Sequence, residues 1–167
     1  MKIGVISDTH IPERAEELPK EIFLAFKDVN LILHAGDFIE LTVLDKLKEI
    51  SQVKAVYGNM DMPEVRNVLA QKEIIEVGKF KIGLIHGWGP PDRLIETIKK
   101  EFPQKINAIV FGSGASSLKS KHDETFTAAA YRWPTSVRGT SPRGLWLDHE
   151  RPGERGSDRG LSGGRGL

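Results

Sequence analysis

The sequence predicts an α/β fold with a largely parallel sheet. Two observations support this prediction. Short apolar runs typical of buried strands alternate with amphipathic patterns typical of helices, in the order β-α-β-α-β-β-β-α-β. Polar residues suited to ligand binding follow several of the predicted strands, and the carboxyl end of the strands is where open α/β sheets bind ligands.

The first half of the chain predicts three strands with two helices between them. Short apolar runs that end in polar residues predict the strands, at Lys2–Ser7, Leu31–His34 and Val53–Tyr57. Apolar residues on one side predict a helix over Pro19–Lys27, with a proline near its start. A second amphipathic pattern predicts a helix within residues 43–50.

The second half predicts a hairpin, a helix and a last strand. Two runs, Lys72–Val77 and Lys79–Ile85, are joined around Gly78 and are typical of a β-hairpin. Apolar residues at helical spacing follow over residues 94–102, and Ile106–Phe111 is another apolar run. The predicted alternation of strands and helices therefore continues to residue 111.

The composition changes at Gly112. Every isoleucine precedes this residue, lysine outnumbers arginine before it, and arginine, glycine and serine dominate after it. A segment of that composition has few residues from which to build a core. We therefore predict a domain over residues 1–112 and an atypical Gly/Arg-rich tail over residues 113–167. A shifted reading frame, a disordered segment or a truly divergent tail would each explain this change.

The charge and the residue types exclude several classes of function. The chain of 167 residues has a formal net charge of +1, which favours neither nucleic acid nor an anionic membrane as a partner. It has no cysteine, which excludes disulfides, thiolate metal sites and cysteine nucleophiles. No segment is typical of a signal peptide or a transmembrane span. We expect a cytoplasmic protein that acts on a small molecule; the oligomeric state stays open.

Asp8 and His10 follow the first predicted strand. Because they are two residues apart in an extended segment, both side chains can face the same way and offer a carboxylate and an imidazole to one ion. Taken alone, this pair is more typical of a solvated turn in which Asp8 caps a backbone amide than of a metal site.

Gly36 and Asp37 follow the second predicted strand. The glycine permits a tight turn, and the two oxygens of Asp37 allow one carboxylate to bridge two cations. His34 lies two residues earlier, within the strand itself. We interpret it as a buried, hydrogen-bonded histidine rather than a ligand.

Two further ligand candidates follow the next predicted strands. Asn59 offers a carbonyl oxygen, although Gly-Asn alone is typical of a turn, and Asp61 would either orient the site or cap that turn. His86 ends an apolar strand and precedes an open loop, Gly87–Pro91, which favours a ligand over a core histidine. Together, these residues predict a site for two metals that activate water for displacement at phosphorus.

The order Asp-x-His, Gly-Asp, Gly-Asn-x-Asp and His-Gly resembles the calcineurin-like metallophosphoesterase superfamily. Within it, the chain is most similar to small single-domain prokaryotic phosphodiesterases, which share their fold with a retromer scaffold subunit. The resemblance implies a four-layer α-β-β-α sandwich and two divalent metal ions. Mn²⁺ is the first expectation, and Ni²⁺, Zn²⁺ or Mg²⁺ also suit nitrogen and oxygen ligands.

The resemblance also implies a role for each residue. Asp8 and His10 would bind the first metal, Asp37 would bridge, and Asn59 and His86 would bind the second. Three residues would belong to the catalytic machinery, namely Asp37, Asn59 and Asp61.

The chain departs from the family pattern at two places. Larger members have a histidine after the Gly-Asn pair, where this chain has Met60, so we expect slow turnover biased toward good leaving groups. The family also continues from its last apolar strand into Gly-His-x-His, whereas Gly112 is followed here by Ser-Gly-Ala. Each metal would thus lose one histidine, and we expect the second sheet to be incomplete.

Two functions follow from these observations. The first is a metal-dependent phosphodiesterase that acts on a small phosphoester through a metal-bridged hydroxide and is impaired by the missing histidines. The second is a catalytically inactive member of the family that keeps the fold as a protein-interaction scaffold. The intact motifs before Gly112 favour the first function, and the absent histidines favour the second.

Overall fold

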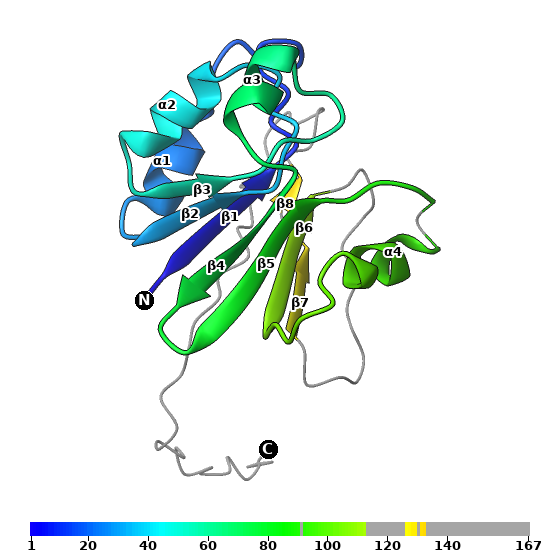
Figure 1. Cartoon of the computed structure of the whole chain (residues 1–167). Helices are drawn as coiled ribbons and strands as arrows, with labels where there is room; N and C mark the ends of the chain where they lie inside the picture. Colours follow the sequence, from blue (N-terminus) through cyan, green and yellow to red (C-terminus); the bar gives the residue numbers. More distant parts are fainter. Residues whose placement is uncertain (91, 113–125, 130, 133–167) are drawn as a thin grey trace, which may run out of the picture.

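Two four-stranded β-sheets lie face to face between helices (Figure 1). This arrangement is seen in a computed structural model of the chain. The structure describes residues 1–90, 92–112, 126–129 and 131–132.

The first sheet consists of parallel strands in the order β3-β2-β1-β8. Strands β1 to β3 occur in the order in which the sequence predicts them, and β8 pairs with β1 from much later in the chain. The strands of this sheet are β1 (Ile3–Ser7), β2 (Leu31–His34), β3 (Val53–Ala55) and β8 (Tyr131–Arg132).

The second sheet has the order β4-β5-β6-β7. The hairpin strands β4 and β5 are antiparallel, whereas β5, β6 and β7 are mutually parallel. The strands of this sheet are β4 (Lys72–Val77), β5 (Phe80–His86), β6 (Ala108–Gly112) and β7 (Phe126–Ala129).

Helices cover the outer face of each sheet. Three short helices pack on the first sheet, namely α1 (Lys20–Phe26), α2 (Thr42–Lys48) and α3 (Pro63–Val68). One helix, α4 (Leu94–Lys100), packs on the second sheet. The layers therefore follow the order α-β-β-α, as Figure 1 shows and as the resemblance predicts.

Alternation along the strands builds three separate hydrophobic cores. In β1, Val5 faces the space between the sheets while Ile6 faces the helices. In β6, Val110 faces that same space while Ile109 and Phe111 face α4. This follows from the period of two in a strand, which places successive side chains on opposite faces. Each buried side chain of this size contributes about 1.5–3 kcal/mol relative to exposure.

The elements before Gly112 match the sequence prediction to within about two residues, with one omission. Helix α3 was not predicted. It begins with Pro63 at its first position, and its buried Val65 packs with the partly buried Leu69 on the first core. Proline at the first helical position and an i, i+4 apolar pair are typical helix signals, but here they span less than two turns.

The sequence pattern identified no strand after Gly112, but the structure has two there. Strands β7 and β8 lie in the predicted tail, where β7 extends the second sheet and β8 extends the first. Strand β7 pairs with the backbone edge of β6, and β8 pairs with that of β1. The sequence itself has no alternating apolar pattern that would have predicted these two strands. The rest of the predicted tail, residues 113–125, 130 and 133–167, lies outside the described residues.

Among the described residues, no helix has both the length and the apolar character needed to cross a lipid bilayer.

Candidate metal centre

The predicted ligand residues lie together at one edge of the two sheets. Asp8 follows the last residue of β1, Asp37 lies in the loop after β2, Asn59 in the loop after β3, and His86 ends β5. Since β1, β2 and β3 are parallel, their carboxyl ends meet at a single edge. His86 reaches the same place from the second sheet.

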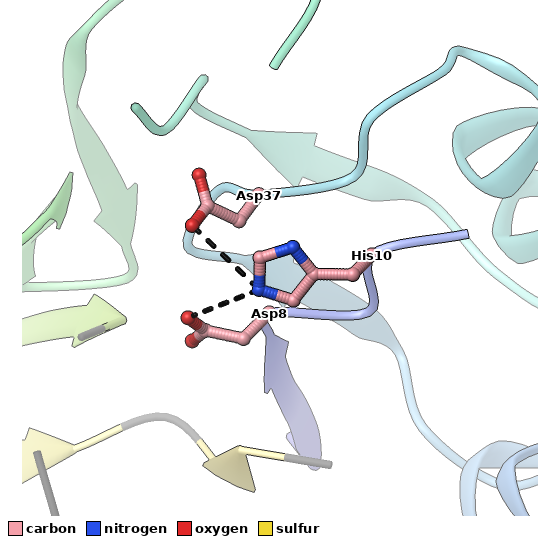
Figure 2. A group of neighbouring side chains, drawn as sticks. All are labelled: Asp8, His10 and Asp37. Atoms are coloured by element: carbon pink, nitrogen blue, oxygen red, sulfur yellow. Dashed lines mark ion pairs between the residues drawn. The ribbon is translucent and has the colours of Figure 1, made fainter. Parts of the chain in front are cut away.

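Asp8, His10 and Asp37 form a compact cluster (Figure 2). The Nε2 atom of His10 lies 3.9 Å from Oδ1 of Asp8 and 3.8 Å from Oδ2 of Asp37. One ligand atom from each residue lies within 4.8 Å of the others, and all three side chains are buried. The three atoms thus converge on a common point.

The spacing of this cluster suits an ion better than direct hydrogen bonds. The separations around His10 exceed the roughly 2.7–3.2 Å of a hydrogen bond. Ligands at about 2.0–2.2 Å from one ion lie roughly 3–4 Å from each other. The Nδ1 atom of His10 is buried and has no hydrogen-bond partner in the described part of the chain. The polar environment of this ring therefore comes mainly from the two carboxylates, a donor set that fits a divalent cation.

A second set of ligand atoms converges around His86. Its Nδ1 lies 2.7 Å from the carbonyl oxygen of Ala35 and must donate a proton there, because the carbonyl can only accept. In the neutral ring, which is the form that binds a metal, Nε2 then carries a lone pair. It faces Oδ1 of Asn59 at 3.1 Å and Oδ2 of Asp37 at 3.4 Å. With the ring in this form, three acceptors face one another and repel unless a cation lies among them, so this set also fits a metal.

Asp37 belongs to both sets of ligand atoms. Its Oδ2 faces the ring nitrogens of His10 and His86, while its Oδ1 accepts a hydrogen bond of 2.8 Å from the backbone amide of Met60. The amide fixes the orientation of the carboxylate, which leaves Oδ2 directed at both histidines. This is the position that a bridging carboxylate would occupy.

The backbone at the site adopts conformations that are rare outside glycine. Asp8, His10, Asp37 and Ile39 have φ of 55°, 48°, 60° and 82°. Such angles cost of order 1–3 kcal/mol each and persist only where surrounding contacts hold them. Here the two loops after β1 and β2 are tied together, since the amide of Asp8 donates to Gly36 at 2.9 Å and that of His10 to Asp37 at 3.0 Å.

Asp61 holds the loop of Asp37 in place. It is buried, and its two carboxylate oxygens accept four backbone hydrogen bonds of 2.6–3.0 Å. The donors are the amides of Asp37, Phe38, Ile39 and Gly58. One carboxylate therefore joins the loop after β2 to the loop after β3. Asp61 therefore caps its own turn through the amide of Gly58 and also fixes the loop that carries Asp37.

Two residues that the sequence analysis did not single out support the ligands. The hydroxyl of Ser7 donates to Oδ2 of Asp8 at 2.5 Å, which leaves Oδ1 facing the cluster. The guanidinium of Arg66 donates to the backbone carbonyls of Asn59 at 2.7 Å and Asp61 at 2.8 Å. Arg66 lies on α3, the helix that was not predicted, so nothing in the sequence placed it near the site.

Gly58 allows the close approach of the two loops. A Cβ atom at this position would overlap Oδ1 of Asp37 and lie 2.6 Å from its backbone nitrogen. Any larger residue must therefore displace Asp37 or the loop that carries it.

His34 is fully buried beside the cluster but does not face it. The amide of Gly36 donates to its Nδ1 at 3.2 Å, so the proton lies on Nε2, which is 3.3 Å from the hydroxyl of Thr9. Its ring stacks on Phe38 with a centroid distance of 3.6 Å. His34 is thus a neutral histidine with both nitrogens hydrogen-bonded.

Burial governs the protonation of three groups at this edge. It lowers the pKa of His10, assisted by the positive charge of Arg14. It holds the pKa of His34 well below the ordinary value of 6.5. Burial also raises the pKa of Asp37, which the nearby charge of Asp8 reinforces. Both histidines are therefore neutral at pH 7, and for His10 this is the form in which an imidazole can bind a metal.

Comparison with known proteins identifies sequence relatives of this chain. A family model described as the calcineurin-like phosphoesterase superfamily domain matches residues 1–124. A probable metallophosphoesterase of Methanocaldococcus jannaschii is 52% identical over 87 residues, covering 52% of this chain and 43% of that protein. A probable metallophosphoesterase of Methanothermobacter thermautotrophicus is 48% identical over 122 residues, covering 73% of this chain and 66% of that protein. The alignments thus span less than two thirds of each relative.

Solved structures with the same fold include proteins of different names. Vacuolar protein sorting 29 of Cryptosporidium parvum has a TM-score of 0.64 at 24% identity, covering 77% of this chain and 72% of that one. A Thermotoga maritima protein has a TM-score of 0.62 at 30% identity, covering 77% and 82%. An archaeal phosphodiesterase has a TM-score of 0.57 at 22% identity, covering 77% and 82%. The first and third, below 25% identity, show a shared fold only.

Proposed function

Because the chain belongs to the calcineurin-like phosphoesterase superfamily, we propose that it is a metal-dependent phosphodiesterase with two divalent ions at the edge described above. One observation carries the proposal. Oδ2 of Asp37 lies 3.8 Å from Nε2 of His10 and 3.4 Å from Nε2 of His86, so one carboxylate oxygen adjoins two separate sets of ligand atoms.

The ligands divide into two sets that share Asp37. Asp8 and His10 complete the set for the first metal, and Asn59 and His86 complete the set for the second. The donors are imidazole nitrogens and carboxylate or amide oxygens, which suit Mn²⁺ and also Ni²⁺, Zn²⁺ or Mg²⁺. We take Mn²⁺ as the first metal to test.

When bound, two such ions would activate water and neutralise charge on the phosphoryl oxygens. The residues of the chain fix the geometry for that chemistry. The proton that His86 donates to Ala35 keeps its Nε2 lone pair directed at the site. Ser7 and the Met60 amide each occupy one oxygen of a ligating carboxylate and so leave the other oxygen free. Asp61 positions Asp37 through the backbone.

Met60 determines which esters the site would hydrolyse well. It follows Asn59 directly, and its backbone amide contacts Asp37, so the residue adjoins the second set of ligands. A thioether cannot donate a proton to a departing alkoxide. We therefore expect hydrolysis to favour esters whose alcohols are acidic, such as phenols, and to be slow for alkyl esters.

A non-catalytic role is the second candidate, and one observation favours it. The parallel strand β6 ends at Gly112, beside the site, and the sequence continues with Ser-Gly-Ala rather than with the two histidines that the resemblance implies. Loss of one ligand per metal would weaken binding of both. In that case the chain would keep the fold and act as a protein-interaction scaffold.

For the enzyme, we propose a small phosphoester as substrate and no membrane or nucleic-acid partner. The formal net charge of +1 supports this choice, because proteins that bind nucleic acid through its phosphates present an excess of positive charge.

The test is hydrolysis of p-nitrophenyl diesters and monoesters by the full chain with Mn²⁺, Ni²⁺, Zn²⁺ or Mg²⁺. The phosphodiesterase proposal predicts slow, metal-dependent hydrolysis of the diesters that is lost in Asp37→Ala. If Asp37→Ala retains the wild-type rate, or if no metal supports hydrolysis, the scaffold is the better account.

A further inference from the structure

Thr9 and His34 form a buried pair that joins the two loops of the first set of ligands. Nε2 of His34 lies 3.3 Å from Oγ1 of Thr9, and both residues are buried. Thr9 lies between Asp8 and His10 in the loop after β1. His34 ends β2, three residues before Asp37. The pair therefore connects the segment of two proposed ligands with the segment of the third.

The direction of each hydrogen bond in the pair follows from the backbone amide of Gly36. An amide can only donate, so Nδ1 of His34, at 3.2 Å, accepts, and the neutral ring carries its proton on Nε2. That proton is donated to the hydroxyl of Thr9. The hydroxyl then has its own proton for the carbonyl oxygen of Asp37, at 3.5 Å. The donors thus run from Gly36 through two side chains and return to the next residue, Asp37.

The core holds the ring of His34 in one orientation. The ring stacks on Phe38 with a centroid distance of 3.6 Å, and Phe38 is fully buried. The amide of Phe38 in turn donates to Asp61 at 2.6 Å. The His34 ring is therefore fixed on its face by Phe38 and at its two nitrogens by Gly36 and Thr9.

The backbone next to the pair needs support from such contacts. Asp8 and His10, on either side of Thr9, have φ of 55° and 48°, and Asp37 has φ of 60°. These conformations persist only where surrounding contacts hold them. The carbonyl of Asp37 accepts from the amide of His10 at 3.0 Å and also from the Thr9 hydroxyl. A metal site tolerates displacements of only about 0.5 Å in its ligands, so small shifts between these loops matter.

We propose that Thr9 and His34 are positioning residues of the first metal. Their hydrogen bond fixes the loop after β1 against the turn that carries Asp37, and so sets the spacing of the three ligand atoms of the first set. Neither side chain belongs to either set of ligands. The inference rests on the proposed function, because it requires that Asp8, His10 and Asp37 bind a metal.

The Mn²⁺ affinity of the full, folded chain tests the pair. Thr9→Val keeps the shape of the side chain but removes the hydroxyl, and we expect the affinity measured by calorimetry to fall at least tenfold. Thr9→Ser keeps the hydroxyl and should restore an affinity close to that of the wild type. Thr97→Val is the matched control, because Thr97 lies on α4, which packs on the second sheet rather than on the two loops.

A double-mutant cycle tests whether the two residues act together. His34→Asn keeps an acceptor for the amide of Gly36 through Oδ1 but lacks the donor that reaches Thr9. Thr9→Val combined with His34→Asn should therefore lose no more Mn²⁺ affinity than the larger of the two single changes. Losses that multiply in the double variant would contradict the joint role.

Amide hydrogen exchange in the metal-free chain distinguishes positioning from a general loss of stability. We expect Thr9→Val to accelerate exchange of the His10 amide, which donates to Asp37, by at least about tenfold. Exchange at Ile32, whose amide donates to Gln52 at 2.8 Å, should accelerate much less. Equal acceleration at both amides would mean that Thr9 supports the fold as a whole, and would overturn the inference.

The outcomes separate this inference from the proposed function. A wild-type chain that binds no Mn²⁺ contradicts the phosphodiesterase, whereas the exchange measurement needs no metal and still reports on the pair. If the wild type binds Mn²⁺ and Thr9→Val binds it equally tightly, the proposed function stands and the inference fails.

Discussion

Oδ2 of Asp37 lies 3.4 Å from Nε2 of His86, although the two residues come from different sheets. Asp37 follows β2 of the first sheet, whereas His86 ends β5 of the second. The first set of ligands, by contrast, belongs entirely to the first sheet. The second metal would therefore link the two halves of the sandwich, and its affinity depends on how the sheets are held together.

Asp37→Asn should abolish high-affinity metal binding. The change keeps the size of the side chain but removes the negative charge that faces both histidines. We expect Mn²⁺ affinity to fall by at least 100-fold, measured by calorimetry. Asp45→Asn is the control, because Asp45 is exposed on α2 and pairs with Lys48 at 3.1 Å. Unchanged Mn²⁺ affinity in Asp37→Asn would contradict the bridging role.

Asp61→Asn should destabilise the whole domain. An amide side chain has one acceptor oxygen and would turn two of its own hydrogens toward backbone amides that now donate to Asp61. Buried donors left without acceptors cost about 1–3 kcal/mol each, so we expect a loss of about 3 kcal/mol. Urea denaturation of the chelated protein measures this loss. The exposed Asp28→Asn should change stability by less than about 0.5 kcal/mol, and an equally small effect at Asp61 would show that its hydrogen bonds do not hold the loops.

Gly58→Ala should damage the metal site more than the fold. The new methyl group would overlap Oδ1 of Asp37 and displace the carboxylate. Gly78→Ala is the matched control, because a Cβ there meets no atom within 4 Å and only the positive φ of 57° opposes it. We expect both variants to fold, the control with a loss of about 1 kcal/mol. Only Gly58→Ala should lose Mn²⁺ affinity, and retention of that affinity would argue against the close packing of the two loops.

The stability of the chelated protein should fall as the pH drops below about 6.5. Burial lowers the pKa of His34 well below its unfolded value of 6.5, so in this range the unfolded chain binds more protons than the folded chain. The free energy of unfolding keeps its full value above the pKa that His34 has in the unfolded chain. It decreases as the pH falls toward the lower pKa that His34 has in the folded chain. Urea midpoints at about pH 7.5 and pH 5.5 measure the change.

His34→Asn is the comparison for this pH effect. Asparagine can still accept from the amide of Gly36 through Oδ1, which takes the place of Nδ1, but it does not titrate. The variant should be less stable than the wild type at pH 7.5 and should lose less stability on acidification. An identical pH dependence in both proteins would exclude His34 as the source.

Restoring histidines after Gly112 should strengthen the site. In the double variant Ser113→His with Ala115→His, the chain regains the Gly-His-x-His order that the resemblance implies. One histidine would then be available for each metal, and we expect Mn²⁺ affinity to rise by at least tenfold and hydrolysis to accelerate. The single change Ser116→His is the control. If affinity and rate stay at wild-type levels, the ligand roles inferred for those two positions are wrong.

The α/β order and the α-β-β-α layers were predictable because strong local patterns coincide with family motifs. The apolar run of β1 and the motif at Asp8 both point to the same edge of a sheet. The sequence could not reveal β7 and β8, since their pairing depends on the edges of β6 and β1 rather than on a pattern of their own. Helix α3 was missed because its six residues carry too little periodicity.

The sequence also suggested which side chains to examine, but not how they are supported. Asp37 was a candidate bridge from its position alone, whereas its contact with the Met60 amide depends on the fold. The sequence left two roles open for Asp61, orienting the site or capping a turn. The residues next to Asp61 could not decide between these roles, because the four amides that donate to its carboxylate come from two different loops. Ser7 gave no signal, since a serine that ends a strand is common.

Electron paramagnetic resonance of the Mn²⁺-loaded full chain tests the central claim most directly. If Asp37 bridges two ions, excess Mn²⁺ should produce the spectrum of an exchange-coupled pair, and Asp37→Asn should reduce it to the signal of uncoupled ions. Coupling arises only between ions that share a ligand or lie very close, so the measurement does not depend on turnover. A spectrum of isolated Mn²⁺ alone in the wild type, or a coupled spectrum that persists in Asp37→Asn, would contradict the bridging role.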